Sequence, residues 1–154
     1  MFRTMHYFFK ATCMLLLLLP ACFTGGKKGG LYVINVLDGE HHADCHIKGS
    51  VNVELDALEN FVKDLDKDTA ELVIYCSNYM CTASGFAAQQ LKEMGFKRVW
   101  AYEAGMAEWY QKGLPVEGPC KKGYLEKVME KPGLDQKEDI GIISTDELAR
   151  KMKL

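Results

Sequence analysis

The sequence has 154 residues, of which 48% are apolar, and this supports one domain with a single core. Its 19 lysines and arginines nearly balance its 21 aspartates and glutamates, and no basic stripe with interleaved aromatic residues is present. We therefore do not expect nucleic acid to be a partner.

The N-terminal segment has the pattern of a bacterial export signal. Arg3 and Lys10 precede an apolar run over residues 11–19. This run is shorter than the roughly 20 residues that span a bilayer, but it suits the apolar part of a signal peptide. It ends in Leu19-Pro20-Ala21-Cys22, which resembles the lipobox of bacterial lipoproteins, where the cysteine is acylated. Cys22 is therefore the expected lipidation site.

On this interpretation residues 1–21 are a signal peptide and the glycine-rich residues 22–30 are a flexible tether. The mature chain would be lipid-anchored to a bacterial membrane on its extracytoplasmic, periplasmic side. An uncleaved signal anchor is the alternative, because Tyr7-Phe8-Phe9 lengthens the apolar run even though Lys10 interrupts it.

Export also bears on the state of the cysteines. Two of the six fall in the predicted signal and at the lipidation site, and the other four would lie in an oxidising compartment. A disulfide between Cys76 and Cys81 and a bridge between Cys45 and Cys120 are both compatible with the sequence, which leaves the choice open.

The domain is expected to begin with a strand over residues 31–37, whose nearly continuous apolar character is typical of an interior strand of a parallel sheet. Asp38-Gly39-Glu40 should be a turn. A group of side chains that can bind metals follows, made up of His41, His42, Asp44, Cys45 and His46. The group lacks the Cys-x-x-Cys or His-x3-His spacing of zinc sites, so we expect no metal and no other cofactor.

A short strand is predicted over residues 51–53, with a helix after it. Asp56 is the expected N-cap of this helix, which should end near residue 65. Its apolar stripe, typical of packing against a core, consists of Leu55, Leu58, Phe61, Val62 and Leu65.

The stretch around Cys76 is the candidate functional site. Leu72-Val73-Ile74-Tyr75 has the pattern of a buried parallel strand, and Cys76 stands at its carboxyl end. A helix is predicted from Ala83 to Met94, with Gly95 at its C′ position. The loop would lie over the helix N-terminus, where backbone N–H groups and the helix dipole favour a thiolate. The alternative is a small buried cysteine that only packs.

Residues 98–102 are predicted to form the next strand. A helix should then begin at Gly105 and be closed by Gly113, with Trp109 as a core residue of this helix.

The C-terminal part is divided by its composition. Residues 119–139 are rich in Lys, Glu, Gly and Pro and should form a mostly exposed connector, with one helical turn near residues 124–129. A strand over residues 140–143 and a helix capped by Ser144 or Thr145 are expected to follow.

Several segments occur in the order and near the spacing of a known protein family. They are His46-Ile47-Lys48-Gly49-Ser50-Val51-Asn52-Val53, Val73-Ile74-Tyr75-Cys76, Gly95-Phe96, Ala104-Gly105 and Gly113-Leu114-Pro115-Val116. Through them, residues 31–118 resemble a rhodanese-like domain. The resemblance implies an α/β fold in which helices flank a parallel sheet.

Such domains usually open with a strand and a Ser-x-Glu-Glu-Leu helix, and nothing similar precedes Leu31. Ile143-Ser144-Thr145-Asp146-Glu147-Leu148 resembles that opening. We therefore expect residues 140–154 to supply the missing edge strand and helix, which would make the domain circularly permuted. The alternative is an amphipathic tail that docks elsewhere.

The resemblance implies a sulfurtransferase in which Cys76 carries sulfane sulfur as a persulfide. The loop resembles a variant with the pattern Cys-x4-Cys-x-x-Ser, formed by Cys76, Cys81 and Ser84, in which Cys81 is a candidate resolving thiol. The other expected substrate-binding residues are Ser77, Asn78, Tyr79, Met80 and Thr82. Because the loop has no lysine or arginine, we expect a polysulfide or protein persulfide as donor rather than doubly charged thiosulfate, and a thiol as acceptor.

Cys76 is predicted to accept sulfur first, because the strand fixes its backbone and its sulfur should face the N–H groups of the loop. Two other function classes stay open. The pair Cys76 and Cys81 could form a thiol-disulfide redox module, or the domain could be a catalytically inactive rhodanese-like module that binds a partner.

Overall fold

Five parallel strands form the central sheet, in the order β3-β1-β4-β5-β7. The structure is a computed structural model, and it describes residues 28–130 and 140–154. The strands are β1 (Lys28–Asn35), β3 (Val51–Asn52), β4 (Leu65–Tyr75), β5 (Arg98–Tyr102) and β7 (Gly141–Ile142). The fold is therefore the expected α/β architecture, with β4 in the middle of the sheet.

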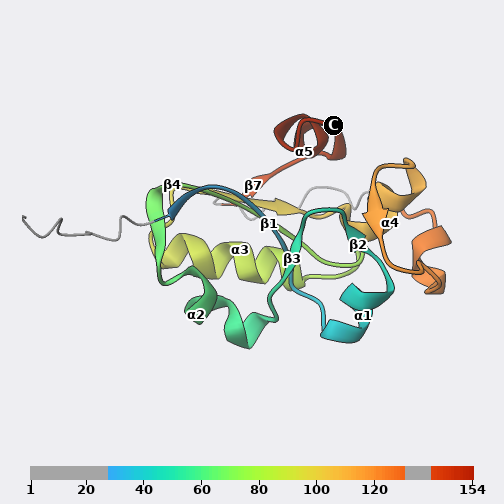
Figure 1. Cartoon of the computed structure of the whole chain (residues 1–154), viewed down its shortest axis with the longest axis horizontal. Coiled ribbons are helices and arrows are strands. Elements are labelled where there is room, and N and C mark those ends of the chain that lie inside the picture. The colour runs from blue at the N-terminus through green and yellow to red at the C-terminus, as the bar shows by residue number, and fades with distance from the viewer. Residues whose placement is uncertain (1–27, 131–139) are drawn as a thin grey trace, which may run out of the picture.

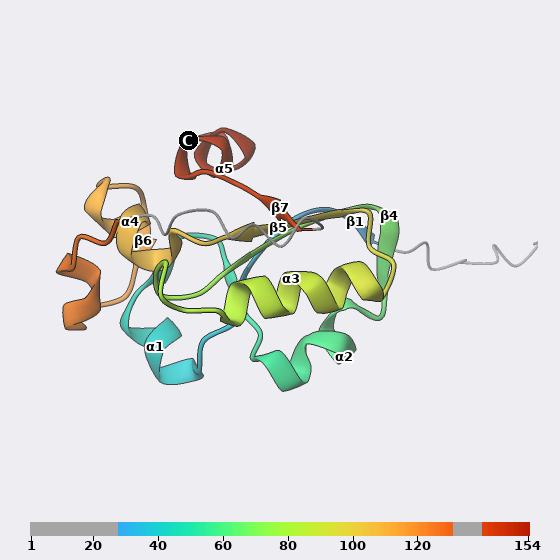
Figure 2. The same cartoon turned by 180° about the vertical axis from the view of Figure 1, so that it is seen from behind.

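Helices cover both faces of this sheet (Figures 1 and 2). On one face lie α2 (Leu58–Val62), which follows a 3-10 turn at Leu55–Ala57, and α3 (Ala83–Glu93). The other face carries α4 (Gly105–Gln111) and α5 (Thr145–Lys151). Beyond the carboxyl ends of the strands lie α1 (Gly39–Asp44) and a small antiparallel pair, β2 (His46–Ile47) with β6 (Val116–Glu117).

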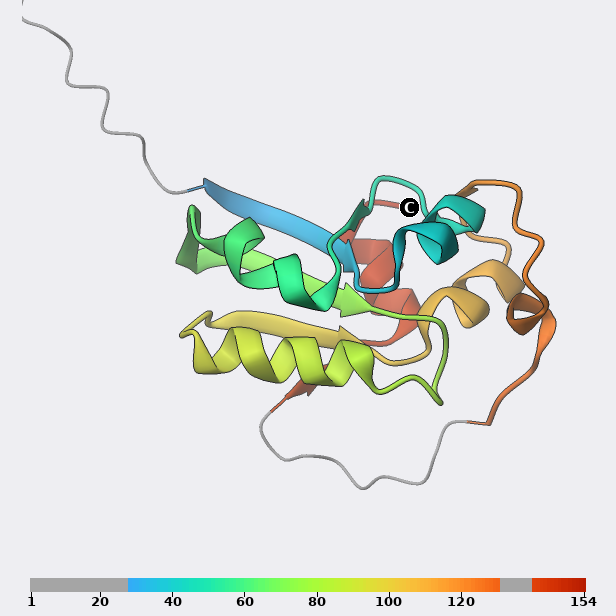
Figure 3. The same cartoon turned by 90° about the horizontal axis from the view of Figure 1, so that it is seen from below.

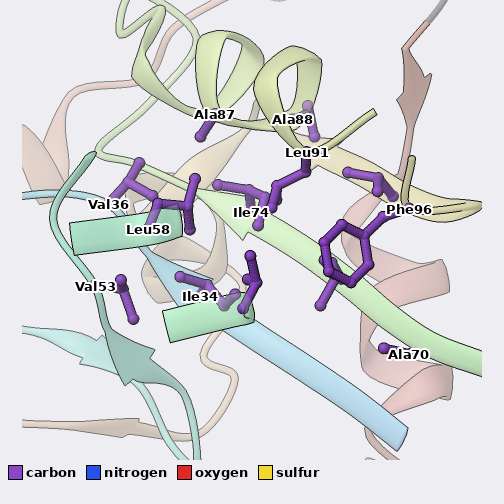
Figure 4. Packing of buried hydrophobic residues seen from close by; sticks show 14 of the residues in the cluster. Ile34, Val36, Val53, Leu58, Ala70, Ile74, Ala87, Ala88, Leu91 and Phe96 are labelled. Carbon is purple, nitrogen blue, oxygen red and sulfur yellow. The ribbon is translucent and has the colours of Figure 1, made fainter. Parts of the chain in front are cut away.

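The residues of β4 alternate between the two cores, as the pleat of a strand requires. Leu72 and Ile74 join the core under α2 and α3, part of which is shown in Figure 4. Val73 and Tyr75 join the opposite core, together with Trp109 of α4. All five side chains are completely buried, which confirms both the buried strand and the core role of Trp109.

Two features at the N-terminal end of the domain differ from those expected: where β1 begins and what Asp38 does. β1 begins at Lys28, inside the predicted tether, because Lys28 pairs with Leu65 of β4. Asp38 does not open a turn but is the N-cap of α1, since its carboxylate accepts the N–H of His41 at 2.8 Å. The signal peptide and the lipidation site lie outside the described residues.

The helix expected to follow an N-cap at Asp56 and to end near residue 65 is shorter than predicted. Asp56 is not its N-cap but lies within the 3-10 turn, and Ala57 stands at the N-cap of α2 without a side-chain hydrogen bond. α2 ends at Val62, because the chain must reverse before Leu65 pairs with β1.

The C-terminal segment lies where the sequence predicts it. β7 pairs in parallel with β5 at the sheet edge, with Gly141 opposite Trp100. Ser144 caps α5 through a capping box, and Ile143 and Leu148 are buried against the second core. The last fifteen residues thus complete the sheet edge and cover one face (Figure 1).

The connector is less exposed than its composition suggests. A 3-10 turn at Gly123–Glu126 buries Leu125, and Cys120 forms a disulfide with Cys45 at the end of α1. The Asp44 carboxylate accepts the backbone N–H groups of Lys121 and Lys122 at 3.1 and 3.0 Å. This part of the connector is therefore fastened to α1 beside the carboxyl edge of the sheet.

We expect loss of the Cys45–Cys120 bridge to lower the free energy of unfolding by about 2 to 4 kcal/mol, because the bridge restricts the unfolded chain. Its two cysteines are 75 positions apart, so the loop it closes is long. Urea unfolding of Cys45→Ser/Cys120→Ser against the parent measures the effect. Adding a reductant should destabilise the parent and leave the double variant unchanged; equal unfolding midpoints for both proteins would contradict the prediction.

Among the helices of the described residues, none combines the length and apolar character needed to cross a bilayer.

Candidate functional site

Cys76 follows directly on β4 at the carboxyl edge of the sheet. The loop that begins there leads to α3, and Figure 3 shows it at the same end of the sheet as α1 and α4. Ligands of open parallel sheets bind at this edge, because loops and helix N-termini meet there. The structure therefore places the predicted loop where a substrate could reach it.

The start of α4 holds the backbone of this loop. The N–H groups of Met106 and Ala107 donate to the carbonyl oxygens of Cys76 and Ser77, both at 2.9 Å. Gly105 makes the close approach possible: its φ is +62°, and a Cβ there would lie 2.7 Å from the Cys76 carbonyl oxygen. A residue far along the chain thus fixes the position of the loop.

A turn within the loop brings Cys81 back towards Cys76. The N–H of Cys81 donates to the carbonyl of Asn78 at 3.0 Å, and the Asn78 side chain accepts the N–H of Met80 at 3.0 Å. Asn78 is buried, whereas Met80 at the tip of the turn is 71% exposed. The turn therefore has a buried polar base and an apolar tip open to solvent.

The Cys76 thiol is completely buried. It donates to the carbonyl oxygen of Cys81 at 3.1 Å, and the Ser84 hydroxyl lies 3.4 Å from the same sulfur. The hydrogen bond to Cys81 and the burial both favour the protonated form, so they raise the pKa of Cys76 far above its ordinary value. In this geometry Cys76 is a thiol and a hydrogen-bond donor.

Cys81 has the opposite environment. Its side chain is only half-buried and lies within hydrogen-bonding reach of the Cys76 sulfur, of the backbone N–H groups of Ala83 and Ser77, and of the Ser77 side chain. These donors outweigh burial and lower the pKa of Cys81 to about 5. Thr82, the N-cap of α3, makes no side-chain cap bond.

This arrangement differs from the one assumed in the prediction that Cys76 accepts sulfur first. The sequence argument puts Cys76 in the cradle of loop N–H groups and Cys81 outside it. In the structure the backbone N–H groups of Ser77 and Ala83 lie near the Cys81 sulfur. The backbone N–H of Ser84 lies near the Cys76 sulfur, and Cys76 has no exposed surface. The order of the two thiols is therefore a separate question from the location of the site.

The remaining predicted substrate-binding residues all lie in or beside this loop, but they face different surroundings. Tyr79 is half-buried and donates its hydroxyl to Glu108 of α4 at 2.9 Å. Thr82 is exposed at the start of α3, and Ser84 is buried beside Cys76. Only the tip of the loop and the Cys81 side therefore present these residues to an incoming molecule.

Glu108 is a site residue that the sequence argument missed. It accepts hydrogen bonds from Tyr79 and from Thr145 of α5, and it lies 3.4 Å from the Lys112 ammonium. Burial opposes its ionisation, but these three partners outweigh burial and lower the pKa of Glu108. Burial, with help from Glu108, raises the pKa of Tyr79 to about 12. The loop is thus linked to a carboxylate and not to a cation.

Three further polar groups near this end of the sheet are buried without a partner, and only His42 among them is named in the sequence analysis. In the part of the chain that the structure describes, the buried atoms without a hydrogen-bond partner are Asn35 Nδ2, His42 Nε2 and the Tyr124 hydroxyl. Burial lowers the pKa of His42, and burial together with the Asp44 carboxylate raises that of Tyr124. Both groups are therefore neutral at pH 7. No sequence pattern marks either of them as a buried group without a partner.

The histidines after β1 make contacts of their own. His41 hydrogen-bonds to the Asp38 carboxylate at 2.8 Å, and Nδ1 of His46 lies 2.8 Å from the His42 carbonyl oxygen. His42 and His46 stack with ring centroids 3.9 Å apart. Within residues 28–130 and 140–154, no three His, Cys, Asp or Glu side chains are grouped as a metal site requires.

Comparisons with known proteins agree with this fold. Residues 25–112 match the family model described as a rhodanese-like domain. Thiosulfate sulfurtransferase GlpE of Shewanella oneidensis is 32% identical over 79 residues, which cover 51% of this chain and 75% of that protein. The protein of the same name from Actinobacillus pleuropneumoniae is 30% identical over 88 residues, covering 57% and 79%.

Solved structures show the same fold. The BH2092 protein of Bacillus halodurans is 28% identical, with a TM-score of 0.54 over 59% of this chain and 66% of that one. The Rhodanese_3-like domain of the Alr3790 protein of Anabaena is 23% identical and has a TM-score of 0.51, over 58% of this chain and 93% of that domain.

Proposed function

Because this chain belongs to the rhodanese-like domain family, we propose that it is a sulfurtransferase that carries sulfane sulfur as a persulfide in the loop after β4. The observation that carries the proposal is the contact between two free cysteines, Cys76 and Cys81, at the carboxyl edge of the sheet. By resemblance, Cys76 corresponds to the family's sulfur-carrying cysteine. Cys81 adds a second thiol that can exchange sulfur with it.

The charge around the loop supports a donor of low charge. Residues 77–82 contain no lysine or arginine, and the polar neighbour of the loop is the Glu108 carboxylate. The nearby Lys112 ammonium is shared between Glu108 and Asp146, at 3.4 and 3.1 Å. A dianion such as thiosulfate would meet this carboxylate without a free cation. The relatives named thiosulfate sulfurtransferase therefore support the reaction class, and we propose a polysulfide or a protein persulfide as donor.

Trapping of the sulfur tests the function. The native protein is incubated with polysulfide or with thiosulfate, alkylated, and mapped by mass spectrometry. We expect a persulfide on the loop, formed at least about ten times faster with polysulfide. If neither donor leaves a persulfide, sulfur transfer by this loop is refuted.

A redox module is the second candidate, and the contact between the Cys76 and Cys81 thiols favours it specifically. In that case the two residues cycle between dithiol and disulfide. The same mass spectra separate the two functions, because a Cys76–Cys81 disulfide that forms without any persulfide supports redox exchange. A loop that gains neither modification supports a binding module instead.

We also propose that the chain is lipid-anchored through Cys22 on the extracytoplasmic side of a bacterial membrane. The Cys45–Cys120 disulfide supports such a location, since structural disulfides persist mainly in oxidising compartments. We expect Cys22→Ser to shift the protein from the membrane fraction to a soluble or unprocessed form, as measured by fractionation and intact mass. A membrane-bound Cys22→Ser variant of unchanged mobility would count against the anchor.

A further inference from the structure

We infer that Glu108 determines which sulfur donors the loop accepts, because its carboxylate keeps this side of the loop negative and holds the Lys112 ammonium in an ion pair. The inference deepens the proposed sulfurtransferase function and rests on it. It assigns the preference for donors of low charge to one side chain of α4. It also implies that a single substitution there opens the loop to dianions such as thiosulfate.

Glu108 lies in the turn of α4 that holds the loop. The two residues before it, Met106 and Ala107, donate their N–H groups to the carbonyl oxygens of the first two loop residues, both at 2.9 Å. Glu108 itself accepts the hydroxyl of Tyr79, three positions after Cys76, at 2.9 Å. The carboxylate is therefore tied to the same loop that carries the thiols.

The Glu108 carboxylate is ionised at neutral pH. Burial raises the pKa of this group, but hydrogen bonds from Thr145 and Tyr79 and the ion pair with Lys112 outweigh burial, so its pKa lies below the ordinary value. Its side chain is 29% exposed, so water and salt screen its charge less than they screen a charge in open solvent. Burial is the main reason for the raised pKa of Tyr79, and Glu108 adds more to it than the neighbouring Glu103 does. A negative charge therefore stands beside the loop throughout the neutral pH range.

Lys112 does not compensate for this charge. Its ammonium lies between two carboxylates, 3.4 Å from Glu108 and 3.1 Å from Asp146. One ammonium and two carboxylates leave a net charge of −1, and loop residues 77–82 supply no lysine or arginine. An approaching anion is therefore repelled, and a dianion is repelled about twice as strongly as a monoanion, because the Coulomb energy is proportional to the charge. Without the charge of Glu108, Lys112 and Asp146 would form a neutral pair.

Two alkylating reagents measure this charge without any sulfur donor. Iodoacetamide is neutral and iodoacetate is a monoanion, and both react with thiolates, so the ratio of their rates at one pH reports the electrostatic potential at a thiol and not its protonation. The full-length protein, with Cys76 and Cys81 reduced and the Cys45–Cys120 bridge retained, is alkylated and mapped by mass spectrometry. As NaCl rises from about 0.01 to 0.5 M, the rate with iodoacetate relative to iodoacetamide should rise about two- to threefold. A ratio that stays constant or falls would overturn the inference.

Two substitutions that remove the same charge at different places form a matched pair. Glu108→Gln keeps the size of the side chain and an oxygen that can accept the Tyr79 hydroxyl. Asp146→Asn changes a carboxylate of α5 that is 74% exposed. At low salt Glu108→Gln should raise the ratio of the two alkylation rates about threefold, and Asp146→Asn should raise it less than about 1.5-fold. Equal ratios in the two variants would show that net charge, and not the position of Glu108, is what the thiols sense.

Loading from thiosulfate is a single displacement. The Cys76 thiolate attacks the outer sulfur of the donor, and a bond forms between Cys76 Sγ and that sulfur. The bond between the two sulfur atoms of thiosulfate breaks, and its electron pair leaves with sulfite. Cys76 then carries the persulfide, and no oxidant or reductant is consumed. A donor R–S–SH reacts in the same way and releases RS⁻.

Sulfur loading of the parent and of Glu108→Gln tests the donor class. Thiosulfate carries two charges, so the substitution should speed its loading by about the square of the effect on iodoacetate, which is about tenfold. A donor R–S–SH with an uncharged R group carries one charge when ionised, and its loading should speed up only about threefold. If thiosulfate loads both proteins at the same rate while R–S–SH loads them, the inference is wrong and the proposed function stands. If no donor leaves a persulfide on either protein, the proposed function fails and the donor preference fails with it.

Discussion

Replacing Gly105 with alanine is expected to abolish sulfur loading and to lower the free energy of unfolding by about 2 to 4 kcal/mol. The added Cβ would lie 2.7 Å from the Cys76 carbonyl oxygen and 2.8 Å from the Asn78 nitrogen, and both are backbone atoms that cannot rotate away. The loop must then move off α4 and lose the bonds from Met106 and Ala107. Those bonds fix the backbone of Cys76 and Ser77, so the change should disturb chemistry and stability together.

Gly113→Ala is the matched control for this substitution. Gly113 has a φ of +66°, close to the +62° of Gly105, but a Cβ there would meet no atom within 4 Å. Gly113→Ala should therefore lower the free energy of unfolding by about 1 to 2 kcal/mol, through the strain of a left-handed backbone alone, and should leave sulfur loading unchanged. Urea unfolding and persulfide trapping on both variants measure the difference. Equal behaviour of the two would show that the contact between Gly105 and the loop is unimportant.

The location of the site could be predicted because it depends on local patterns. Four apolar residues before Cys76 specify a buried strand, and the helical spacing from Ala83 to Gly95 specifies a helix after the loop. A thiol between them must then lie at the carboxyl edge of a parallel sheet. The C-terminal strand and helix were predictable for the same reason, since the Ser144 capping box is a local signal.

The surroundings of the two sulfur atoms could not be predicted, because they depend on contacts between distant residues. Cys76 is covered since α4, almost thirty positions later, holds the loop against the sheet. Glu108 meets Tyr79 and Thr145 only in the folded chain, and both Glu108 and Thr145 look like ordinary helix residues in the sequence. The choice between two disulfides was open for the same reason: only the fold shows that Cys120 returns to Cys45.

The packing of α5 gives the second large expected effect. Leu148 is completely buried in the core that also contains Tyr75 and Trp109. Leu148→Ala should lower the free energy of unfolding by about 3 to 5 kcal/mol, because it removes apolar contacts and leaves a cavity. Leu154→Ala is the control: the same change at a side chain that is 57% exposed should cost less than about 0.5 kcal/mol.

The effect should extend to the site, because α5 is joined to the loop. Thr145 of α5 donates to Glu108, which accepts the Tyr79 hydroxyl, and Tyr102 lies 2.9 Å from Thr145 Oγ1. A loosened α5 should therefore also slow sulfur loading in Leu148→Ala. Urea unfolding and persulfide trapping on the two leucine variants test this link. If Leu148→Ala unfolds at the same urea concentration as Leu154→Ala, α5 does not pack on the sheet, and the C-terminal segment does not complete the domain.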